Sequence, residues 1–424
     1  MAVTVFPCWL SGTIAAPPSK SDFQRACAAA LLYNGRTTLI HPGTSADDAA
    51  ALQLAVDLGL TIVSRNAHEI QVDSSGTVRP RTDTVFCGES GLATRLFIPI
   101  AALSNQKITF SGSGSLLNRP IRFFYDVLPR LGVSVWGNAQ TLPITVQGPL
   151  KPQSLTVDGS VSSQFSSGLL MALSAAVTEA VTLQIEQAVS QPYLDMTVAT
   201  LQAFGKTVLP EANGVYRIKP ATIPSGTGLV YPVEGDWSSS AAWLVAAALG
   251  APVSIERLSA DSLQADRSIL DIFSQTGLKS SFTSGVLSVS GSPQNGFLFD
   301  ATHAPDLVPV LAVLACSLPG ESRICGLHRL LHKESNRLES VTHLLRNGGI
   351  RFTVTGDCLT IPGHQSFSAC EVHSFNDHRI VMAATLAALQ ASGPITITDE
   401  SAIRKSYPAF LDDFRALGGV AEFR

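Results

Sequence analysis

The chain has 424 residues, of which 45% are hydrophobic and 15% are charged, and its formal net charge is −4 at pH 7. This length exceeds that of one hydrophobic core, so we expect two domains, and the low charge content favours an α/β protein whose elements are buried on several faces. The net charge argues against nucleic acid or an anionic membrane as a partner, and the longest apolar runs, such as 307–318, are shorter than the roughly 20 residues that span a bilayer.

The predicted elements follow an internal repeat. Six segments show the pattern of an amphipathic helix, a glycine and then a strand, and their glycines are separated by 73, 73, 72, 72 and 70 residues. Each glycine suits the left-handed position that ends a helix. In chain order these glycines are Gly59, Gly132, Gly205, Gly277, Gly349 and Gly419.

A second set of six segments alternates with the first at the same period. Each has a polar or glycine-containing start followed by a nearly all-apolar stretch, which is typical of a helix buried inside a core. The starts are 19–25, 88–95, 162–168, 235–241, 304–310 and 376–382.

The two sets together predict repeats of about 70 residues, each with the order βαβαββ and with one buried and one exposed helix. Three repeats per domain give two similar domains, split near 232–235. The alternative is an ordinary α/β protein in which glycine and leucine recur by chance. Two interleaved sets with a common period argue against that alternative.

The polar starts of the buried helices predict a site for anions, because a helix N-terminus offers unpaired N–H groups and a partial positive charge. If the three buried helices of each domain point the same way, six such ends face one interdomain cleft. A solvated surface charge is the simpler interpretation of any single cation here, but recurrence favours a shared site. The cations at or near these starts are Lys20, Arg25, Arg95 and Arg379, and those in other polar segments are Arg119, Lys333, Arg337 and Lys405.

Familiar phosphate and metal motifs do not occur in the sequence. There is no GxxxxGK[ST], GSGSLL at 112–117 lacks the third glycine of a dinucleotide fingerprint, and there is no HExxH. His328 and His332 are four residues apart, but no acidic partner completes a metal triad. We therefore expect no metal.

Seven scattered cysteines without a CxxC pair, and an N-terminus without an export pattern, predict reduced thiols in a cytoplasmic protein. Cys87 lies near the predicted anion site, and we interpret it as a buried core thiol. The other cysteines are Cys8, Cys27, Cys316, Cys325, Cys358 and Cys370.

Ten motifs occur in the order and at the spacings of a known family. They are PPSKSDFQRA, CGESGLATR, NRPI, SSQFSSGLLMA, QPYLDMT, VEGDWSSSA, PDLVPVLA, HKESNRLES, FNDHRIVMA and KSYP. Over essentially its whole length the chain thus resembles the EPSP synthases (3-phosphoshikimate 1-carboxyvinyltransferases). The resemblance implies two domains of three βαβαββ units joined by a double-crossover hinge. Residues 14–233 would form the domain that mainly binds shikimate 3-phosphate, and residues 1–13 plus 234–424 the domain with the catalytic carboxylates.

The activity implied by the resemblance is transfer of the carboxyvinyl group of phosphoenolpyruvate to the 5-hydroxyl of shikimate 3-phosphate. This addition–elimination gives 5-enolpyruvylshikimate 3-phosphate and phosphate, on the shikimate pathway to chorismate and the aromatic amino acids. The resemblance implies no cofactor, and we expect a monomer whose partners are its two substrates.

The resemblance also implies roles for individual residues. Lys20 would contact both substrates, Gln164 would lie between them, and Tyr193 would pack near the shikimate ring. Asp306 would act as base and Glu334 would handle the proton at the vinyl methylene, with Lys20 and Lys405 completing the catalytic set. The other residues implied to bind shikimate 3-phosphate are Ser21, Arg25, Ser162, Ser163, Ser190 and Lys333. Those implied to bind phosphoenolpyruvate, besides Lys20, Gln164 and Glu334, are Gly91, Arg119, Arg337, His378, Arg379 and Lys405.

The residue types fit this chemistry. Two substrates with several negative charges need a cationic pocket, in which arginine binds carboxylate through two hydrogen bonds. Two carboxylates in different environments can divide acid and base work.

Simpler interpretations stay open for several of these residues. Asp306 could cap the helix that follows it, and the serines at 162–163 could cap theirs. Tyr193 could be a packing residue and His378 could only anchor a helix start. Glu334 could form a surface pair with Lys333, and Arg119 could pin the turn before its proline.

Three positions depart from the commonest form of the family. Glu89 stands where asparagine is usual and Leu92 where threonine or serine is usual. Glu89 should weaken anion binding unless it is paired, for example with Arg95. Arg329 occupies the place of a polar residue that contacts shikimate, so that contact is not transferred.

Three other functions compete. A UDP-amino-sugar enolpyruvyl transferase typically starts its first helix with Lys-Asn and has a reactive loop cysteine, whereas this chain has Lys20-Ser21 and no cysteine between Cys87 and Cys316. A non-catalytic homologue that binds phosphorylated metabolites would not need the intact set of Lys20, Asp306, Glu334 and Lys405. A ring-shaped DNA clamp does not fit the negative net charge.

Overall fold

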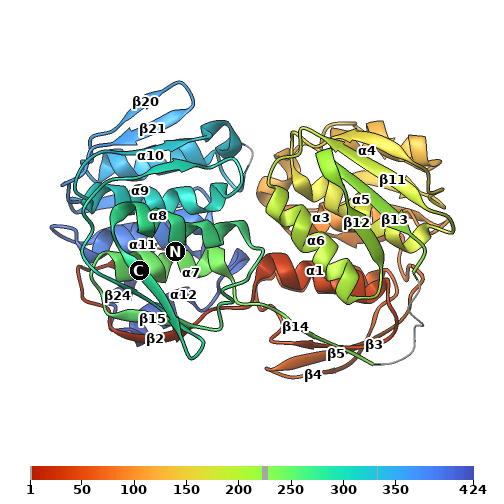
Figure 1. The fold of residues 1–424 in the computed structure, drawn as a ribbon, viewed down its shortest axis with the longest axis horizontal. Coiled ribbons are helices and arrows are strands. Elements are labelled where there is room, and N and C mark those ends of the chain that lie inside the picture. The colour runs from red at the N-terminus through yellow and green to blue at the C-terminus, as the bar shows by residue number, and fades with distance from the viewer. Residues whose placement is uncertain (1, 222–227, 332) are drawn as a thin grey trace. The chain divides into compact units, whose positions relative to one another are not determined.

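The computed structural model describes residues 2–221, 228–331 and 333–424. The chain forms two compact units: unit 1 comprises residues 1–17 and 235–424, and unit 2 comprises residues 18–234. In each unit, helices pack together and four-stranded sheets lie on the outside of the helices (Figure 1).

Unit 2 contains three βαβαββ repeats, each with one four-stranded sheet. The first has α1 (Lys20–Leu31), β3 (Asn34–Ile40), α2 (Ala46–Asp57), β4 (Thr61–Arg65), β5 (Glu69–Ser75) and β14 (Leu229–Pro232). The second has β6 (Thr84–Phe86), α3 (Gly91–Ala101), β7 (Lys107–Ser111), η1 (Gly114–Asn118), α4 (Arg122–Val127), η2 (Leu128–Leu131), β8 (Ser134–Gly137) and β9 (Ile144–Gln147). The third has β10 (Leu155–Asp158), α5 (Ser163–Ala176), β11 (Val181–Glu186), α6 (Gln191–Ala203), β12 (Thr207–Pro210), η3 (Ala212–Gly214) and β13 (Val215–Lys219).

Unit 1 has the same organisation. Its first repeat has β2 (Gly12–Ala15), α7 (Trp237–Ala248), β15 (Val253–Glu256), η4 (Ala265–Ser268), α8 (Ile269–Thr276), β16 (Lys279–Thr283) and β17 (Val286–Ser290). The second has β18 (Leu298–Asp300), η5 (Pro305–Leu307), α9 (Val308–Ser317), β19 (Ser322–Cys325), η6 (Leu327–Leu330), α10 (Arg337–Asn347), β20 (Thr353–Thr355) and β21 (Cys358–Ile361). The third has β22 (Cys370–His373), α11 (His378–Leu389), β23 (Ile395–Thr398), η7 (Glu400–Lys405), α12 (Phe410–Ala416), β24 (Ala421–Phe423) and β1 (Ala2–Val5).

Three strands reach their sheets from distant parts of the chain. β14 pairs in parallel with β3, β2 pairs in parallel with β15, and β1 pairs with β23 and β24. The pairing of Ile14 with Ile255 and of Ala15 with Glu256 keeps residues 14–17 in unit 1, whereas the expected boundary assigned them to the other domain. Each unit thus contains at least one sheet that is completed by a strand distant in sequence from its partners.

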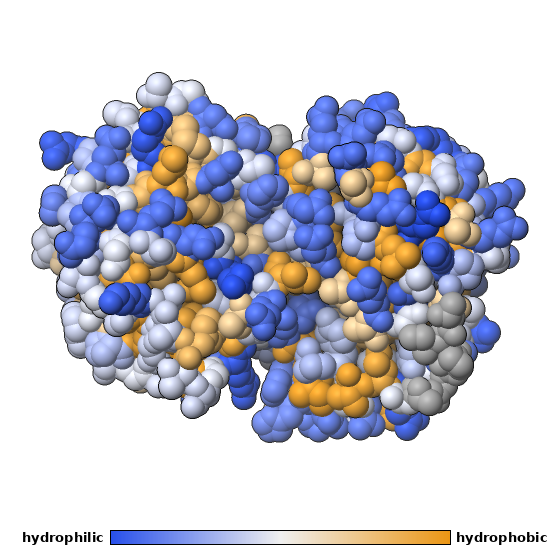
Figure 2. Space-filling model, in the orientation of Figure 1, coloured by the Kyte–Doolittle hydropathy of each residue, from blue (hydrophilic) through white to orange (hydrophobic). Residues whose placement is uncertain are grey.

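The helices predicted to be buried form the core of each unit, which confirms the predicted fold. Every residue of α3 and of α7 is buried, and in α9 and α11 only the last residue is not. Burial of each large aliphatic side chain stabilises such a core by about 1.5–3 kcal/mol. Figure 2 shows hydrophobic residues on the surface as well, over the sheet of β14, β3, β5 and β4, whose strands expose Ile62, Val63 and Val230.

Five of the six predicted helix-ending glycines have a positive φ, from +76° to +84° at four of them and +125° at Gly59. The prediction for Gly419 is wrong, because its neighbour Gly418 takes the positive φ of +100° after α12. A side chain on Gly419 would instead meet Phe414, with a Cβ only 2.4 Å from the ring. In the part of the chain that the structure describes, no helix is long and apolar enough to cross a membrane.

Candidate active site

In unit 2 the start of α1 carries three of the predicted site residues. Ser19 caps the helix by accepting the N–H of Asp22, and Lys20 forms an ion pair of 3.1 Å with Asp47 from the start of α2. Arg25 is buried, and its three nitrogens donate to the Oγ1 of Thr197 at 2.8 Å, the carbonyl of Ser21 at 2.8 Å and the carbonyl of Tyr193 at 3.0 Å. Arg25 therefore joins the starts of α1 and α6.

Burial also shifts the pKa values of Arg25 and Asp22 in α1. It lowers the pKa of Arg25 to about 10, which still leaves the guanidinium charged at neutral pH. It raises the pKa of Asp22 to about 6, against the stabilising hydrogen bonds from the Tyr231 hydroxyl at 2.6 Å and the Glu234 N–H at 2.9 Å. Asp22 thereby joins α1 to the segment that follows β14.

The start of α3 is held against the segment that leads to Arg119. Ser90 caps α3 by accepting the N–H of Ala93, and Nη1 of Arg119 lies only 2.6 Å from where a Cβ on Gly91 would stand. A residue larger than glycine at 91 would displace this guanidinium. The structure thus places Gly91 and the buried Arg119 side by side.

The starts of α5 and α6 supply the hydroxyl and amide groups. Ser162 accepts the N–H of Gln164 at 3.3 Å, so the capping interpretation holds for this serine, while Ser163 is the buried first residue of α5. Gln164 accepts a hydrogen bond of 2.6 Å from Arg95 in α3. Ser190 precedes α6 in the left-handed conformation (φ +53°), and the Tyr193 ring lies 5.9 Å from the Arg25 guanidinium.

In unit 1 a single buried arginine links three carboxylates. Arg337, the first residue of α10, donates from Nε to Asp377 at 2.8 Å and from Nη2 to Glu334 at 2.5 Å, and its Nη1 contacts Asp306. Asp377 caps α11 through the N–H of Arg379. The starts of α9, α10 and α11 therefore meet at Arg337.

Asp306 is surrounded by cations. Lys333 donates to its Oδ1 at 3.0 Å, and about a quarter of each of these two side chains is exposed. Burial alone would raise the pKa of Asp306, but the charges of Lys333, Arg337 and Arg379 outweigh it and hold the pKa well below the usual value. Asp306 is therefore a carboxylate at neutral pH. Its side chain makes no capping bond to α9, so the capping interpretation is not supported among the described residues.

The remaining predicted residues of unit 1 lie at the start of α11 and the end of η7. His378 and Arg379 are both buried, and Nη1 of Arg379 lies 3.8 Å from the sulfur of Met382. Lys405 donates to the carbonyl of Asn376 at 2.8 Å. Burial lowers the pKa of Arg329, in η6, and the negative charge of Asp306 partly opposes this shift. η5 and η6 pack against each other.

Sequence reasoning missed the partners that hold these side chains. Asp377, Asp47 and Thr197 were not expected to take part, and Arg95 was not expected to hold Gln164. The signal that could have identified Asp377 is its place directly before the HR pair of NDHR, where an aspartate is a favoured helix cap.

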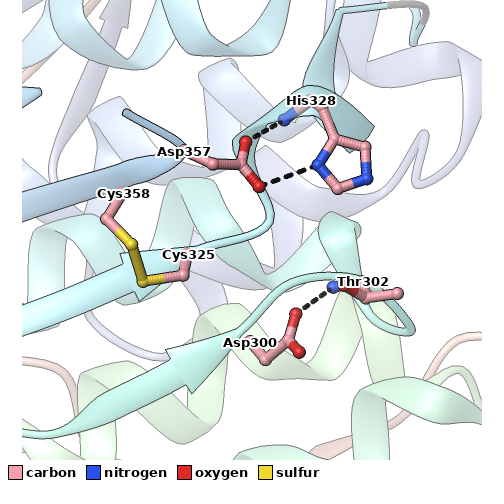
Figure 3. Close-up of a disulfide and its surroundings, with 6 residues drawn as sticks. All are labelled: Asp300, Thr302, Cys325, His328, Asp357 and Cys358. Atoms are coloured by element: carbon pink, nitrogen blue, oxygen red, sulfur yellow. Dashed lines mark hydrogen bonds and ion pairs between the residues drawn. A yellow bond between two sulfur atoms is a disulfide. The ribbon is translucent and has the colours of Figure 1, made fainter. Parts of the chain in front are cut away.

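The prediction that the cysteines are reduced is wrong for two of them. Cys325 and Cys358 form a disulfide between β19 and β21 (Figure 3). The two residues are direct partners in the antiparallel register, with Cα atoms 4.0 Å apart, so their side chains lie on the same face. The other cysteines are free thiols, and burial raises the pKa of Cys87 to about 12, as expected for a core thiol.

The turn after β19 is fixed next to this disulfide. Asp357, the neighbour of Cys358, accepts both the backbone N–H and the Nδ1 of His328 at 2.8 Å (Figure 3). Of the two histidines considered for a metal, His328 is thus paired with Asp357, and His332 lies outside the described residues. Within the described ranges no group of three His, Cys, Asp or Glu residues could hold a metal ion.

Comparison with known proteins gives a consistent result. The family model of EPSP synthase (3-phosphoshikimate 1-carboxyvinyltransferase) matches residues 7–414. The 3-phosphoshikimate 1-carboxyvinyltransferases of Clostridium kluyveri and Clostridium acetobutylicum are 34% and 33% identical to this chain, and each match covers 98% of this chain and 97% of the relative.

Among solved structures, EPSP synthase from Acinetobacter baumannii shares the fold with a TM-score of 0.83 at 24% identity, over 99% of both chains. The enolpyruvyl transferase NikO from Streptomyces tendae also shares it, with a TM-score of 0.78 at 17% identity, over 99% of this chain and 98% of that one. The fold likeness and the full-length family match agree with the ten motifs. The chain belongs to the EPSP synthase family.

Proposed function

We propose that this protein transfers the carboxyvinyl group of phosphoenolpyruvate to the 5-hydroxyl of shikimate 3-phosphate, as a step toward chorismate and the aromatic amino acids. The observation that carries the proposal is the cluster of Asp306, Glu334, Lys333 and Arg337 at the starts of the unit 1 helices. It stands in a chain whose full-length relatives are named for this reaction.

Unit 2 supplies most of the binding of shikimate 3-phosphate in this proposal. Ser162, Ser163 and Ser190 stand at two helix starts, where hydroxyl and N–H groups suit a phosphate. Lys20, Ser21 and Arg25 are grouped in the first two turns of α1. Tyr193 would pack near the ring of shikimate and Gln164 would lie between the substrates.

Each unit also contains residues to which we assign phosphoenolpyruvate binding. In unit 2 these are Lys20, Arg119 and the backbone N–H of Gly91, and in unit 1 they are Arg337, His378, Arg379 and Lys405. Arg337 already bonds three carboxylates, so an incoming substrate carboxylate would have to replace one of them. Asp377 is fully buried, whereas Asp306 and Glu334 are 26% and 17% exposed, so the exchange would occur at these two.

The same exchange would prepare the proton transfers. In the addition, the 5-hydroxyl gives its proton to Asp306 while its oxygen bonds to C2 of phosphoenolpyruvate, and protonated Glu334 gives a proton to the methylene carbon. In the elimination, Glu334 takes a proton back from the methyl group, the bond between C2 and the phosphate oxygen breaks, and the leaving phosphate receives the proton held by Asp306. Lys333 and Lys405 offset the negative charge that develops on oxygen.

These steps are proton transfers and an addition at carbon, which the side chains can perform, so we propose a cofactor-independent enzyme. We also propose that it is a cytoplasmic monomer whose partners are its two substrates, with no bound nucleic acid or membrane. The Cys325–Cys358 disulfide is unusual for that compartment.

One assay tests the substrate assignment. Phosphate release is measured with phosphoenolpyruvate plus either shikimate 3-phosphate or UDP-N-acetylglucosamine, and we expect release with the first acceptor only. Release with UDP-N-acetylglucosamine alone would replace the proposed acceptor. Release with neither acceptor would favour a non-catalytic homologue that binds phosphorylated metabolites.

A further inference from the structure

The segment 87–89 is joined to the segment 111–115 by regularly spaced hydrogen bonds. β6 and β7 pair in parallel as far as Phe86 and Ser111. Beyond the strands, the N–H of Cys87 donates to the carbonyl of Ser111 at 2.9 Å, and the N–H of Ser113 donates to the carbonyl of Gly88 at 2.8 Å. The next connection comes from a side chain, because the carboxylate of Glu89 accepts the N–H of Ser115 at 3.2 Å.

The glycine at 114 makes room for this carboxylate. A Cβ on Gly114 would lie 2.2 Å from Oε2 and 2.6 Å from Oε1 of Glu89, which is far inside van der Waals contact. Gly114 also has a φ of +54°, which a residue with a side chain adopts at a cost. The Glu89 carboxylate therefore occupies space that is open only because residue 114 has no side chain.

The short helix η1 begins at this connection and ends at Arg119. Its last turn is closed by the N–H of Arg119 donating to the carbonyl of Leu116 at 3.1 Å. The Arg119 guanidinium then returns to Gly91, two residues after Glu89. The segments 88–91 and 114–119 thus contact each other at both ends, through Glu89 at one end and through Arg119 at the other.

We propose that Glu89 is a positioning residue that fixes the 112–119 segment so that Arg119 is held beside the backbone of Gly91. From the sequence, an unpaired Glu89 was expected to weaken anion binding, because a carboxylate stands near an anion-binding loop. We infer the opposite net effect, because the carboxylate accepts the N–H of Ser115 in the first turn of η1, and η1 ends at Arg119. This inference rests on the proposed function only in naming phosphoenolpyruvate as the anion.

The kinetic test compares Glu89→Ala with Glu89→Gln. Removing the acceptor should raise KM for phosphoenolpyruvate by about tenfold or more, because small displacements of a substrate-binding group cost large factors, while KM for shikimate 3-phosphate stays within about twofold. The glutamine keeps its amide oxygen for Ser115 and should recover most of the affinity. Glu179→Ala, at an exposed position in the same unit, serves as the control.

A second measurement does not depend on turnover. Gly114→Ala should lower the free energy of unfolding much less in the Glu89→Ala background than in the wild type, because the added methyl group then meets no carboxylate. In a crystal structure of Glu89→Ala, Arg119 should leave its place beside Gly91.

Three results would overturn the inference: equal KM changes for both substrates, additive effects of the two substitutions, or an unmoved Arg119. If the wild type releases no phosphate with any acceptor, the proposed function fails, and the structure of Glu89→Ala still decides the role of Glu89.

Discussion

Each unit contains an almost completely buried arginine, Arg25 in unit 2 and Arg337 in unit 1, and the two differ in their hydrogen-bond acceptors. In unit 2, Arg25 gives all its hydrogen bonds to neutral acceptors: a threonine hydroxyl and two backbone carbonyls. In unit 1, Arg337 bonds three carboxylates and Lys333 bonds one of them. A neutral acceptor satisfies a donor without cancelling its charge, whereas a carboxylate does both. We infer that the charge of Arg25 in unit 2 stays available to an anion, whereas the charge of Arg337 in unit 1 is already compensated by acids.

The largest expected effect is on turnover, when a carboxylate of unit 1 is removed. Asp306→Asn should lower kcat by about 100- to 10,000-fold, the range for loss of a general base, while the dissociation constant of shikimate 3-phosphate changes by less than about threefold. Stopped assays and calorimetric titration measure the two quantities. Asp300→Asn is the control, since Asp300 bonds the N–H of Thr302 on the same unit. Near-normal turnover of Asp306→Asn would remove this carboxylate from the mechanism.

A covalent link also distinguishes the units, because the disulfide lies in unit 1. Thiol titration of the unfolded protein should find five thiols without reductant and seven after reduction, since five of the seven cysteines are free. For a separation of 33 residues, the chain-entropy model gives a loss of about 3–4 kcal/mol when the bond is reduced. Calorimetry should show the loss in one transition only. Seven thiols without reductant would show that the pair stays reduced.

In unit 2, folding changes the pKa of the Asp22 carboxyl group. Its pKa is raised from 3.8 in the unfolded chain to about 6, chiefly by burial and opposed by Tyr231, Glu234 N–H and Arg25. The folded protein therefore binds this proton more tightly, and the stability that Asp22 contributes is full below pH 4 and is lost as the pH rises through 6.

Asp22→Asn tests this dependence, because the amide can keep both hydrogen bonds without a charge. Relative to the wild type, the variant should gain about 2–3 kcal/mol of unfolding free energy between pH 4 and pH 7. Urea unfolding at a series of pH values measures the difference. A difference that does not change with pH would contradict the raised pKa.

The smallest effect is expected for a single hydroxyl in unit 2. Ser163→Ala should weaken binding of shikimate 3-phosphate by about tenfold, the value of one hydrogen bond to a charged group, and should leave kcat nearly unchanged. Thr178→Ala, an exposed change in the same unit, should alter neither quantity. A loss confined to kcat would place Ser163 with the proton-transfer residues and would contradict the assignment of substrate binding to unit 2.

The sequence predicted the helices well because their signals are local. An apolar stretch after a polar start decides burial by itself, and the six buried helices occur where that pattern predicted them. The strands β1, β2 and β14 were harder, since each pairs with a strand far away in the chain and has only four residues. The Cys325–Cys358 bond depends on a strand register, which no spacing pattern reveals.

The sequence could predict which residues belong to the candidate site, but not which hydrogen-bond partners hold their side chains. The motifs pointed to Asp306, Glu334 and Arg337, and the structure brings these three together. The role of Asp377 as a third carboxylate on Arg337, and the contact of Glu89 with Ser115, depend on turns whose geometry is set by packing. The glycine after α12 shows the same limit, since the sequence pattern does not tell Gly418 from Gly419, and they differ only in their packing, against Trp9 and Phe414 respectively.

In the proposed reaction, unit 1 adds a proton to the methylene carbon of phosphoenolpyruvate and then removes one. The most direct test is to run the wild-type reaction in D₂O and to measure deuterium at the vinyl position of the product by NMR. We predict incorporation by the wild type and loss of that incorporation together with turnover in Glu334→Gln. Product formed at full rate without deuterium at that carbon would contradict the addition–elimination route and the role given to unit 1.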